Sequence, residues 1–291
     1  MSLALLDWGI GGLGFYRAFK ERLPDVPVVY LSDTGFEPYG LVPGPALRRR
    51  LALTAGWLAG AGAKRLVVAC NAMSTVLPAP PWLTELGFEQ VCGVIDGGVA
   101  ATLEAGVRTV GVIGGRRTVR SGCYARPLRA AGLVVRQRVA QPLSGLIEAG
   151  MVASPDFAAE SARIVAPLAE VDALVLGCTH YAAAADRLRA LAGAARLVDP
   201  AAETLERVVL GWYGVAASGD GRGGRAAERG RGADSSAGSS TIRSSVECSS
   251  ADRFFTTGDP TAMARAARLA FGVELPAVER VRLRATGPVP A

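Results

Sequence analysis

Two stretches of the 291-residue chain decide its fold, LVVACNA at 66–72 and LVLGCTH at 174–180. Each runs from a short apolar block into a cysteine that is followed by a polar residue. An uninterrupted apolar block of this length is typical of a strand buried on both faces of a parallel sheet. Because the two stretches echo each other, they predict two similar halves, each with a cysteine at the carboxyl end of a strand.

Further apolar blocks alternate with alanine- and arginine-rich segments of helical length, which indicates an α/β protein. We predict two similar doubly wound α/β domains related by a pseudo-two-fold axis, with the active site in the cleft between them. Ligands of such sheets bind beyond the carboxyl ends of the strands. The predicted strands span residues 3–6, 28–31, 66–69, 91–95, 110–113, 134–137, 173–176 and 197–198.

The expected first domain is discontinuous, with residues 1–95 and 201–291, and the second domain spans residues 96–200. Within the first domain, residues 216–252 are rich in glycine, serine and charge. Such a segment has too few apolar side chains to offset the entropy of ordering, so we predict a disordered insertion. The ordered chain is expected to resume at RFFTTGDP, 253–260, and a helix whose apolar stripe is Met263, Ala267 and Phe271.

Charge and apolar content argue against nucleic-acid and membrane partners. The net charge of +6 is dispersed, and its densest run, Arg48, Arg49 and Arg50, is expected on a solvated helix. No window approaches the roughly 18 apolar residues of a membrane span, and the N-terminus lacks signal-peptide features. The five cysteines form no CxxC pair, which favours free thiols and a reducing compartment. We therefore expect a cytoplasmic protein.

The sequence offers little for metal or serine-hydrolase chemistry. His180 is the only histidine, and the cysteines lack the local spacing of a zinc site, so no metal is predicted. A Ser-His-Asp triad is improbable because no GxSxG motif occurs.

Cys70 and Cys178 are stronger candidates for catalytic residues. Each cysteine ends a predicted strand and precedes a helix, whose N-terminal amides and dipole favour a thiolate. Two such groups facing across a cleft suit racemisation, because one thiolate removes a Cα proton while the opposite thiol delivers one to the other face. The other three cysteines, Cys92, Cys123 and Cys248, are expected to be structural.

Two further side chains lie close enough in sequence to tune these thiols. His180 follows Cys178 by two residues and could shuttle its proton, and Asp7, at the end of the first strand, could do the same for Cys70. The alternatives are structural: a hydrogen-bonded histidine at a strand end and a helix-capping aspartate.

A competing motif is GxGxxG at 9–14, with Asp33 at the end of the next strand where a ribose-binding acid would lie. This pattern is typical of dinucleotide binding. Asp7 would place negative charge near the pyrophosphate, however, and Trp8 is bulky where the backbone must approach phosphate closely. Dinucleotide binding is therefore the weaker alternative.

Taken together, the motifs resemble those of glutamate racemases, in the aspartate/glutamate racemase superfamily, along nearly the whole chain apart from the insertion. The matching segments are DWGIGGLG (7–14), LSDTGFEPYG (31–40), VVACNAMST (67–75), VGVIGGRRTVRSGCY (110–124), PLSGLIEAG (142–150), LVLGCTHY (174–181) and FFTTGDP (254–260).

The resemblance implies an isomerase that interconverts L- and D-glutamate without a cofactor and supplies D-glutamate to peptidoglycan synthesis. Cys70 would act on the D-enantiomer and Cys178 on the L-enantiomer, with Asp7, Glu148 and His180 assisting proton transfer. It implies a small amino acid as the binding partner, and it allows a homodimer.

The resemblance also implies a substrate pocket. Residues 33–40 would receive the side-chain carboxylate, and polar residues near the cysteines would hold the head group. The candidate substrate-binding residues are Trp8, Pro38, Tyr39, Gly40, Asn71, Ala72, Thr118 and Thr179.

Three positions depart from the family pattern. Trp8 replaces a serine, Ala72 replaces a threonine, and Gly115 stands where a threonine is usual. Each lost hydrogen bond to a charged group costs roughly 1.5 to 3 kcal/mol. Two alternatives to glutamate racemisation therefore stay open: a racemase of another acidic amino acid such as aspartate, and a racemase-derived binding or regulatory protein without turnover.

Overall fold

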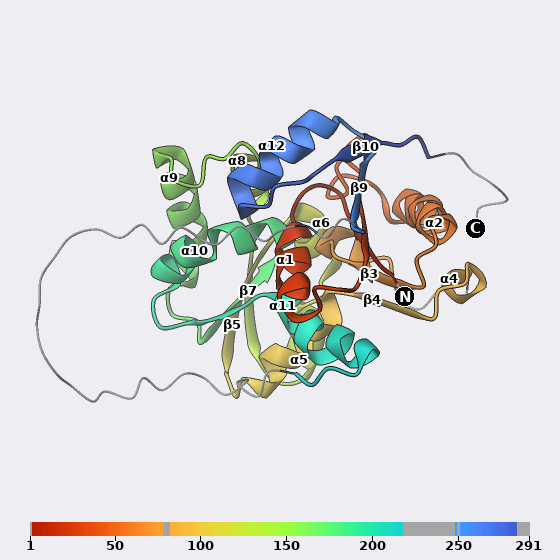
Figure 1. Cartoon of the computed structure of the whole chain (residues 1–291). Coiled ribbons are helices and arrows are strands. Elements are labelled where there is room, and N and C mark those ends of the chain that lie inside the picture. Colours follow the sequence, from red (N-terminus) through yellow and green to blue (C-terminus); the bar gives the residue numbers. More distant parts are fainter. Residues whose placement is uncertain (1, 78–81, 218–247, 249–250, 284–291) are drawn as a thin grey trace, which may run out of the picture.

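The computed structural model describes residues 2–77, 82–217, 248 and 251–283, which form two parallel β-sheets with helices around them (Figure 1). The six-stranded sheet has the order β10-β9-β2-β1-β3-β4, and the four-stranded sheet has the order β6-β5-β7-β8. The strands are β1 Leu3–Asp7, β2 Val28–Ser32, β3 Arg65–Val68, β4 Gln90–Gly93, β5 Thr109–Gly114, β6 Val134–Val139, β7 Ala173–Gly177, β8 Arg196–Val198, β9 Arg253–Thr256 and β10 Val278–Arg280.

The same strand order occurs in both sheets. Reading outward from β1 and β3, the order β2-β1-β3-β4 in one sheet matches β6-β5-β7-β8 in the other, and every one of these pairings is parallel. In each sheet the chain winds first to one side and then to the other, so the order reverses between β1 and β3 and between β5 and β7. Open α/β sheets bind ligands at the carboxyl ends of the strands flanking such a switch point.

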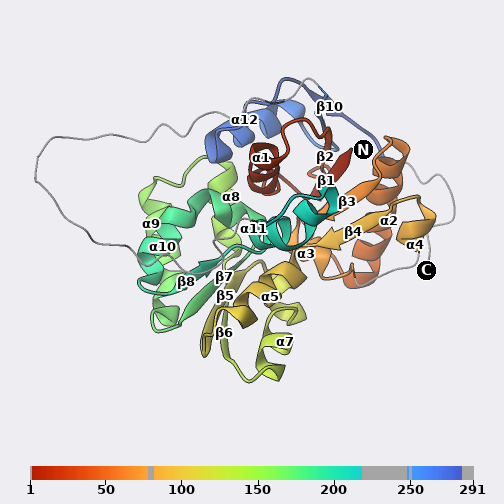
Figure 2. The same cartoon turned by 60° about the horizontal axis from the view of Figure 1, so that its bottom comes forward.

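Helices connect the strands and cover the sheets (Figure 2). They are α1 Leu13–Arg22, α2 Gly44–Gly60, α3 Asn71–Ser74, α4 Trp82–Glu85, α5 Ile95–Glu104, α6 Arg116–Ser121, α7 Ala125–Ala130, α8 Gln141–Glu148, α9 Pro155–Val165, α10 Ala185–Ala192, α11 Pro200–Thr204 and α12 Pro260–Phe271. The short 3₁₀ and π turns are η1 Ala166–Leu168, η2 Thr179–Ala184, η3 Leu205–Val209 and η4 Leu210–Tyr213. No described helix has the length and apolar character that crossing a membrane requires.

Strand β1 shows why the apolar blocks are uninterrupted. Its side chains alternate between two core clusters, with Leu3 and Leu5 in one and Ala4 and Leu6 in the other, and all four are fully buried. Both faces of the strand are therefore covered, as the sequence predicts for a parallel sheet.

The α/β class with parallel sheets is confirmed, and all eight predicted strands are present. Strands β9 and β10 were not predicted; β9 pairs with β2 and extends the first sheet. The apolar stripe of α12 is buried as expected, at Met263, Ala267 and Phe271. The six-stranded sheet uses residues 3–93 and 253–280 and the other uses 109–198, whereas the domain boundaries and the pseudo-two-fold relation stay predictions.

Most of the predicted insertion, 216–252, lies outside the described residues. Its two edges are described, and both are attached to α1. Arg22 donates to the Ala216 carbonyl at 2.8 Å, and Lys20 forms a buried ion pair with Asp252 at 3.1 Å. Residues 251 and 252, which the prediction places in the insertion, are therefore part of the described fold.

The arginine run on α2 is only partly solvated. Arg48 and Arg49 are exposed as predicted, but Arg50 is half-buried and forms a two-pronged ion pair with the fully buried Asp33. This contact corrects the expectation of a wholly solvated run.

Two glycines allow α5 and α11 to pack closely where the chain passes between the sheets. The two helices lie side by side in both views (Figures 1 and 2). A Cβ at Gly97 would collide with the Thr204 side chain and lie 2.8 Å from its Cα, and a Cβ at Gly98 would lie 2.8 Å from the Pro200 side chain. The contact therefore depends on the absence of side chains at these positions.

We expect Gly97→Ala to lower the free energy of unfolding by about 1–3 kcal/mol, because the new methyl group overpacks a contact with backbone. Urea unfolding followed by circular dichroism measures this. Gly56→Ala on α2 is the matched control, since a Cβ there meets no atom within 4 Å. Gly56→Ala is expected to raise the free energy of unfolding by up to about 1 kcal/mol, because alanine has the higher helix propensity. Equal effects of the two substitutions would contradict the role given to Gly97.

Candidate active site

The first thiol, Cys70, lies at the carboxyl end of β3. It is 7% exposed and caps the N-terminus of α3 in an extended conformation. Burial raises the pKa of this thiol well above its usual range, and the negative charge of Asp7 raises it further. Cys70 therefore rests as a thiol until a neighbouring group takes up its proton.

Asp7 is the buried carboxylate beside Cys70. Its oxygens accept from the backbone amides of Trp8 at 2.7 Å and Gly12 at 2.6 Å, and from the Thr179 hydroxyl at 3.2 Å. Burial raises its pKa, although His180 and the Cys70 thiol oppose that rise. The Thr179 contact joins the end of β1 to the segment after β7, so Asp7 belongs to both halves of the site.

The second thiol, Cys178, occupies the position after β7 that Cys70 occupies after β3. It is partly exposed and caps η2, again in an extended conformation. Its sulfur lies 3.7 Å from Nδ1 of His180. Thr179, the residue after Cys178, donates to Asp7, which lies beside Cys70, and this contact brings the two strand ends that carry the thiols together.

His180 is held between Cys178 and Glu148. Its Nε2 lies 2.9 Å from Glu148 Oε1 at the end of α8. Burial lowers the pKa of His180, but the hydrogen bonds to Cys178 and Glu148 outweigh burial and raise that pKa well above its ordinary value. Burial raises the pKa of Glu148, and the hydrogen bond to His180 outweighs this and lowers it. The three side chains therefore form a continuous chain of contacts from Glu148 through His180 to Cys178.

The glycine motif at 9–14 has a structural explanation. A Cβ at Gly9 would collide with the Glu148 carboxylate, and a Cβ at Gly11 would lie 2.7 Å from His180 Nδ1. These glycines bring the β1–α1 loop against the His180–Glu148 pair. This close approach accounts for the pattern that also suggested dinucleotide binding.

Asp33 cannot serve as a ribose-binding acid. Its carboxylate is fully buried and accepts from the guanidinium of Arg50, the hydroxyl of Tyr39 at 2.6 Å and the hydroxyl of Thr257 at 2.8 Å. The carboxylate instead fixes the loop that follows β2. The structure therefore gives neither the glycine motif nor Asp33 a role in dinucleotide binding.

The predicted substrate loop, 33–40, is anchored by side chains that the resemblance assigned to binding. The Tyr39 side chain is buried and its hydroxyl is committed to Asp33. The Trp8 indole nitrogen donates to the Phe36 carbonyl at 3.0 Å, so this ring lies against the loop. Pro38 and Gly40 are half-buried at its end.

On the other side of Cys70, Asn71 is 2% exposed and its Oδ1 accepts from the Tyr124 hydroxyl at 2.6 Å. Its Nδ2 is buried and has no hydrogen-bond partner among the described residues. Buried amide N–H groups are usually paired, so this one is available to a ligand carboxylate. Thr118 is also buried, whereas Ala72 is half-buried and offers no polar group.

Three contact residues were not predicted. Tyr124 binds Asn71 across the cleft. Arg117 donates to the Thr75 hydroxyl at 2.8 Å and to the Val42 carbonyl at 2.9 Å. Gln141 Oε1 would lie 3.1 Å from a Cβ at Gly115, the position where the family pattern has threonine. Arg117 and Tyr124 lie in the segment 110–124 that resembles the racemase family, and Gln141 directly precedes the segment 142–150. Their roles were missed because they depend on contacts between distant segments of the chain.

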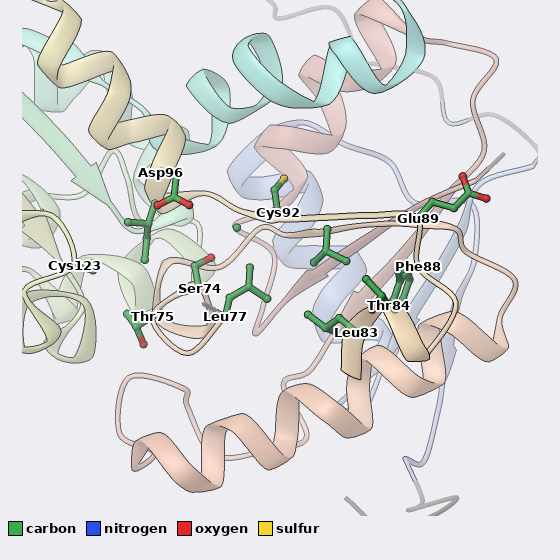
Figure 3. Close-up of a pocket in the computed structure, with 13 residues that line it drawn as sticks. Ser74, Thr75, Leu77, Leu83, Thr84, Phe88, Glu89, Cys92, Asp96 and Cys123 are labelled. Carbon is green, nitrogen blue, oxygen red and sulfur yellow. The ribbon is translucent and has the colours of Figure 1, made fainter. Parts of the chain in front are cut away.

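A cavity of about 590 Å³ lies beside β4 and α4, and neither Cys70 nor Cys178 lines it (Figure 3). Thr75 and Asp96 lie toward one end of it, and Leu83 and Phe88 lie toward the other. None of the predicted site residues lines it. The partly buried Cys92 and Cys123 both border it while packing against core clusters, in keeping with a structural role. Among the described residues, no cluster of three or more histidine, cysteine or acidic side chains could hold a metal ion.

Two thiols at equivalent switch points, each beside titratable side chains, suit stereochemical inversion at a carbon acid, the chemistry of amino-acid racemases. Residues 13–208 match the model of the family described as Asp/Glu/Hydantoin racemase. The chain is 36% identical to a glutamate racemase of Aquifex aeolicus, over 62% of this chain and 71% of that protein. It is 32% identical to one of Beutenbergia cavernae, over 99% of this chain and 95% of that protein.

The structure is similar to that of a glutamate racemase from Thermus thermophilus crystallised with beta-chloro-D-alanine. The TM-score is 0.74 at 29% identity, with 96% of both chains covered. These similarities make the protein an isomerase of the amino-acid racemase type. The chain belongs to the Asp/Glu/Hydantoin racemase family.

The single histidine allows a direct test of the contact between His180 and Glu148. In wild type, the imidazole proton signals of His180 should titrate with a midpoint above 6.5, the ordinary value. In Glu148→Gln the midpoint should fall, because the negative charge that raises the pKa of His180 is lost while the burial that lowers it remains. NMR of tag-free protein across pH measures both.

The same pKa shift has a consequence for stability. Because folding raises the pKa of His180, its contribution is fully present below the unfolded pKa of about 6.5 and is lost as pH rises through the folded value. A wild-type midpoint at or below 6.5 would rule out the ion pair with Glu148.

Proposed function

We propose that the protein interconverts L- and D-glutamate without a cofactor, with Cys70 and Cys178 as acid and base on opposite faces of the substrate. The observation that carries this proposal is the equivalent placement of the two thiols after β3 and β7, at the switch points of two sheets with the same strand order. Each thiol has separate proton-transfer partners, Asp7 for Cys70 and the His180–Glu148 pair for Cys178.

In the proposed reaction, a thiolate removes the Cα proton, and the electron pair of the broken C–H bond stays on the substrate as a carbanion. The opposite thiol then gives its proton to the other face of Cα and becomes the thiolate. Cys70 acts on the D-enantiomer and Cys178 on the L-enantiomer. After one turnover the protonation states of the two thiols are exchanged, and their proton-transfer partners restore them.

The substrate head group is proposed to lie between Asn71, Thr118 and Thr179. The unpaired Nδ2 of Asn71 supports this placement, because it is a buried donor that a carboxylate would satisfy. The side-chain carboxylate is proposed to lie against the loop 33–40. There the Tyr39 hydroxyl is already committed to Asp33, so the backbone amide at Gly40 is the proposed donor.

Glutamate is favoured over aspartate as the substrate by the relatives, which are glutamate racemases. D-glutamate made in this way would serve peptidoglycan synthesis. The five free cysteines are in keeping with a reducing cytoplasm, and a homodimer stays a prediction.

We expect wild type to exchange the α-proton of L- and D-glutamate for deuterium in heavy water with inversion, and Cys70→Ser and Cys178→Ser each to abolish racemisation. One-dimensional proton NMR and polarimetry measure exchange and inversion separately. Cys92→Ser, which changes a partly buried thiol outside the site, is the control and should retain activity. No exchange with either enantiomer of glutamate or aspartate would favour a binding protein without turnover.

Replacing Trp8 tests its role in the substrate loop. Trp8→Phe keeps an aromatic ring but removes the donor to the Phe36 carbonyl, a contact worth about 0.5–1.5 kcal/mol. We expect KM for glutamate to rise about 2- to 10-fold, with kcat nearly unchanged. Trp57→Phe on α2, whose ring packs on Phe255, is the control. An unchanged KM in the Trp8 variant would show that this contact does not hold the loop for binding.

A further inference from the structure

A hollow lined by three arginines lies at the end of the substrate loop. It has a volume of about 410 Å³, with residues 40–42 on one side and Arg116, Arg117 and Arg120 of α6 on the other. Gly40 belongs both to this hollow and to the loop proposed to receive the substrate carboxylate. The hollow therefore adjoins the proposed substrate site.

The charge of this hollow is unbalanced. No carboxylate is among the residues that line it. Arg116 and Arg120 are exposed, and neither forms an ion pair within the described part of the chain. Burial lowers the pKa of Arg117, and the positive charge of Arg48 on α2 lowers it further. Like charges are thus held together in a concave site that an anion would neutralise.

The three arginines have different tasks. The guanidinium of Arg117 is occupied by Thr75 and Val42, so it joins α6 to the opposite side of the cleft and fixes the wall of the hollow. Arg116 and Arg120 extend from the same short helix and keep their charges for solvent or a ligand. Their backbone position is set by Arg117 between them.

We propose that this hollow is a capture site for small carboxylate anions entering the cleft, with the acidic amino-acid substrate as its ligand. The identity of that ligand rests on the proposed function. An exposed guanidinium–carboxylate pair adds little affinity at equilibrium. A cluster of one sign beside a cleft instead raises the rate at which an opposite charge arrives, and salt screens this effect. The arginines should therefore act on substrate entry rather than on proton transfer.

Two alkylating reagents test entry without requiring turnover. Iodoacetate is a small carboxylate and iodoacetamide is its neutral analogue, and both modify the partly exposed thiol of Cys178. The ratio of their rates at Cys178, measured by peptide mass spectrometry, reports the advantage of negative charge and cancels the thiol's own reactivity. In Arg116→Gln/Arg120→Gln this ratio should fall about 3- to 10-fold at low ionic strength.

The matched control is Arg187→Gln/Arg189→Gln, which removes the same charge from exposed positions on α10, outside the hollow. It should leave the ratio near that of wild type. The difference between the pairs should shrink as ionic strength rises from about 0.01 M to 0.15 M, because the screening length falls from about 30 to 8 Å. An equal ratio in the two variants at about 0.01 M ionic strength, where screening is weakest, overturns the proposal.

The racemisation assay separates this proposal from the proposed function. If wild type racemises glutamate and the α6 variant loses kcat/KM but keeps kcat at low ionic strength, both stand. If wild type does not turn over but the alkylation ratio falls in the α6 variant, the capture site stands and the proposed function fails. If turnover occurs and the ratio does not change, the capture site alone fails.

Discussion

The site depends on a buried carboxylate, that of Asp7. Burying an ionised carboxyl group costs several kcal/mol unless it is paired or hydrogen-bonded. The amides of Trp8 and Gly12, in the connection between β1 and α1, and the Thr179 hydroxyl meet this requirement. The amides come from one sheet's connection and the hydroxyl from the other's. Satisfying the hydrogen bonds of this one buried carboxyl group therefore holds together the two halves that carry Cys70 and Cys178.

The second constraint is the close approach of backbone segments to neighbouring residues at several glycines. The backbone at Gly9 and Gly11 lies against Glu148 and His180, and at Gly97 the backbone of α5 lies against Thr204. In each place a methyl group would force neighbouring atoms apart. Glycine is needed at these positions because any larger residue would separate the segments that pack there.

Much of this arrangement could be predicted from the sequence. The apolar blocks predicted eight parallel strands, and the echo of LVVACNA and LVLGCTH predicted two thiols at equivalent strand ends, because both signals are local. Strand β9 was missed because it is short and its partner β2 lies far along the chain, and β10 was missed because it has three residues, two of them charged. The Asp33–Arg50 pair could not be predicted either, since a loop carboxylate and a helix arginine reveal their contact only after folding. The GxGxxG pattern was ambiguous because close packing and phosphate binding both require glycine.

The chain on both sides of residues 217–251 is attached to one helix, α1. This attachment has an evolutionary consequence. Arg22 binds Ala216 and Lys20 binds Asp252, so the chain on both sides of the segment is attached within the last turn of α1. The entropy of closing a loop grows only slowly, by about 0.6 kcal/mol for each doubling of its length. Its length is therefore nearly decoupled from the stability of the racemase core. Lineages could lengthen, shorten or replace this segment while leaving the catalytic centre intact, which makes it a natural point for acquiring lineage-specific sequence.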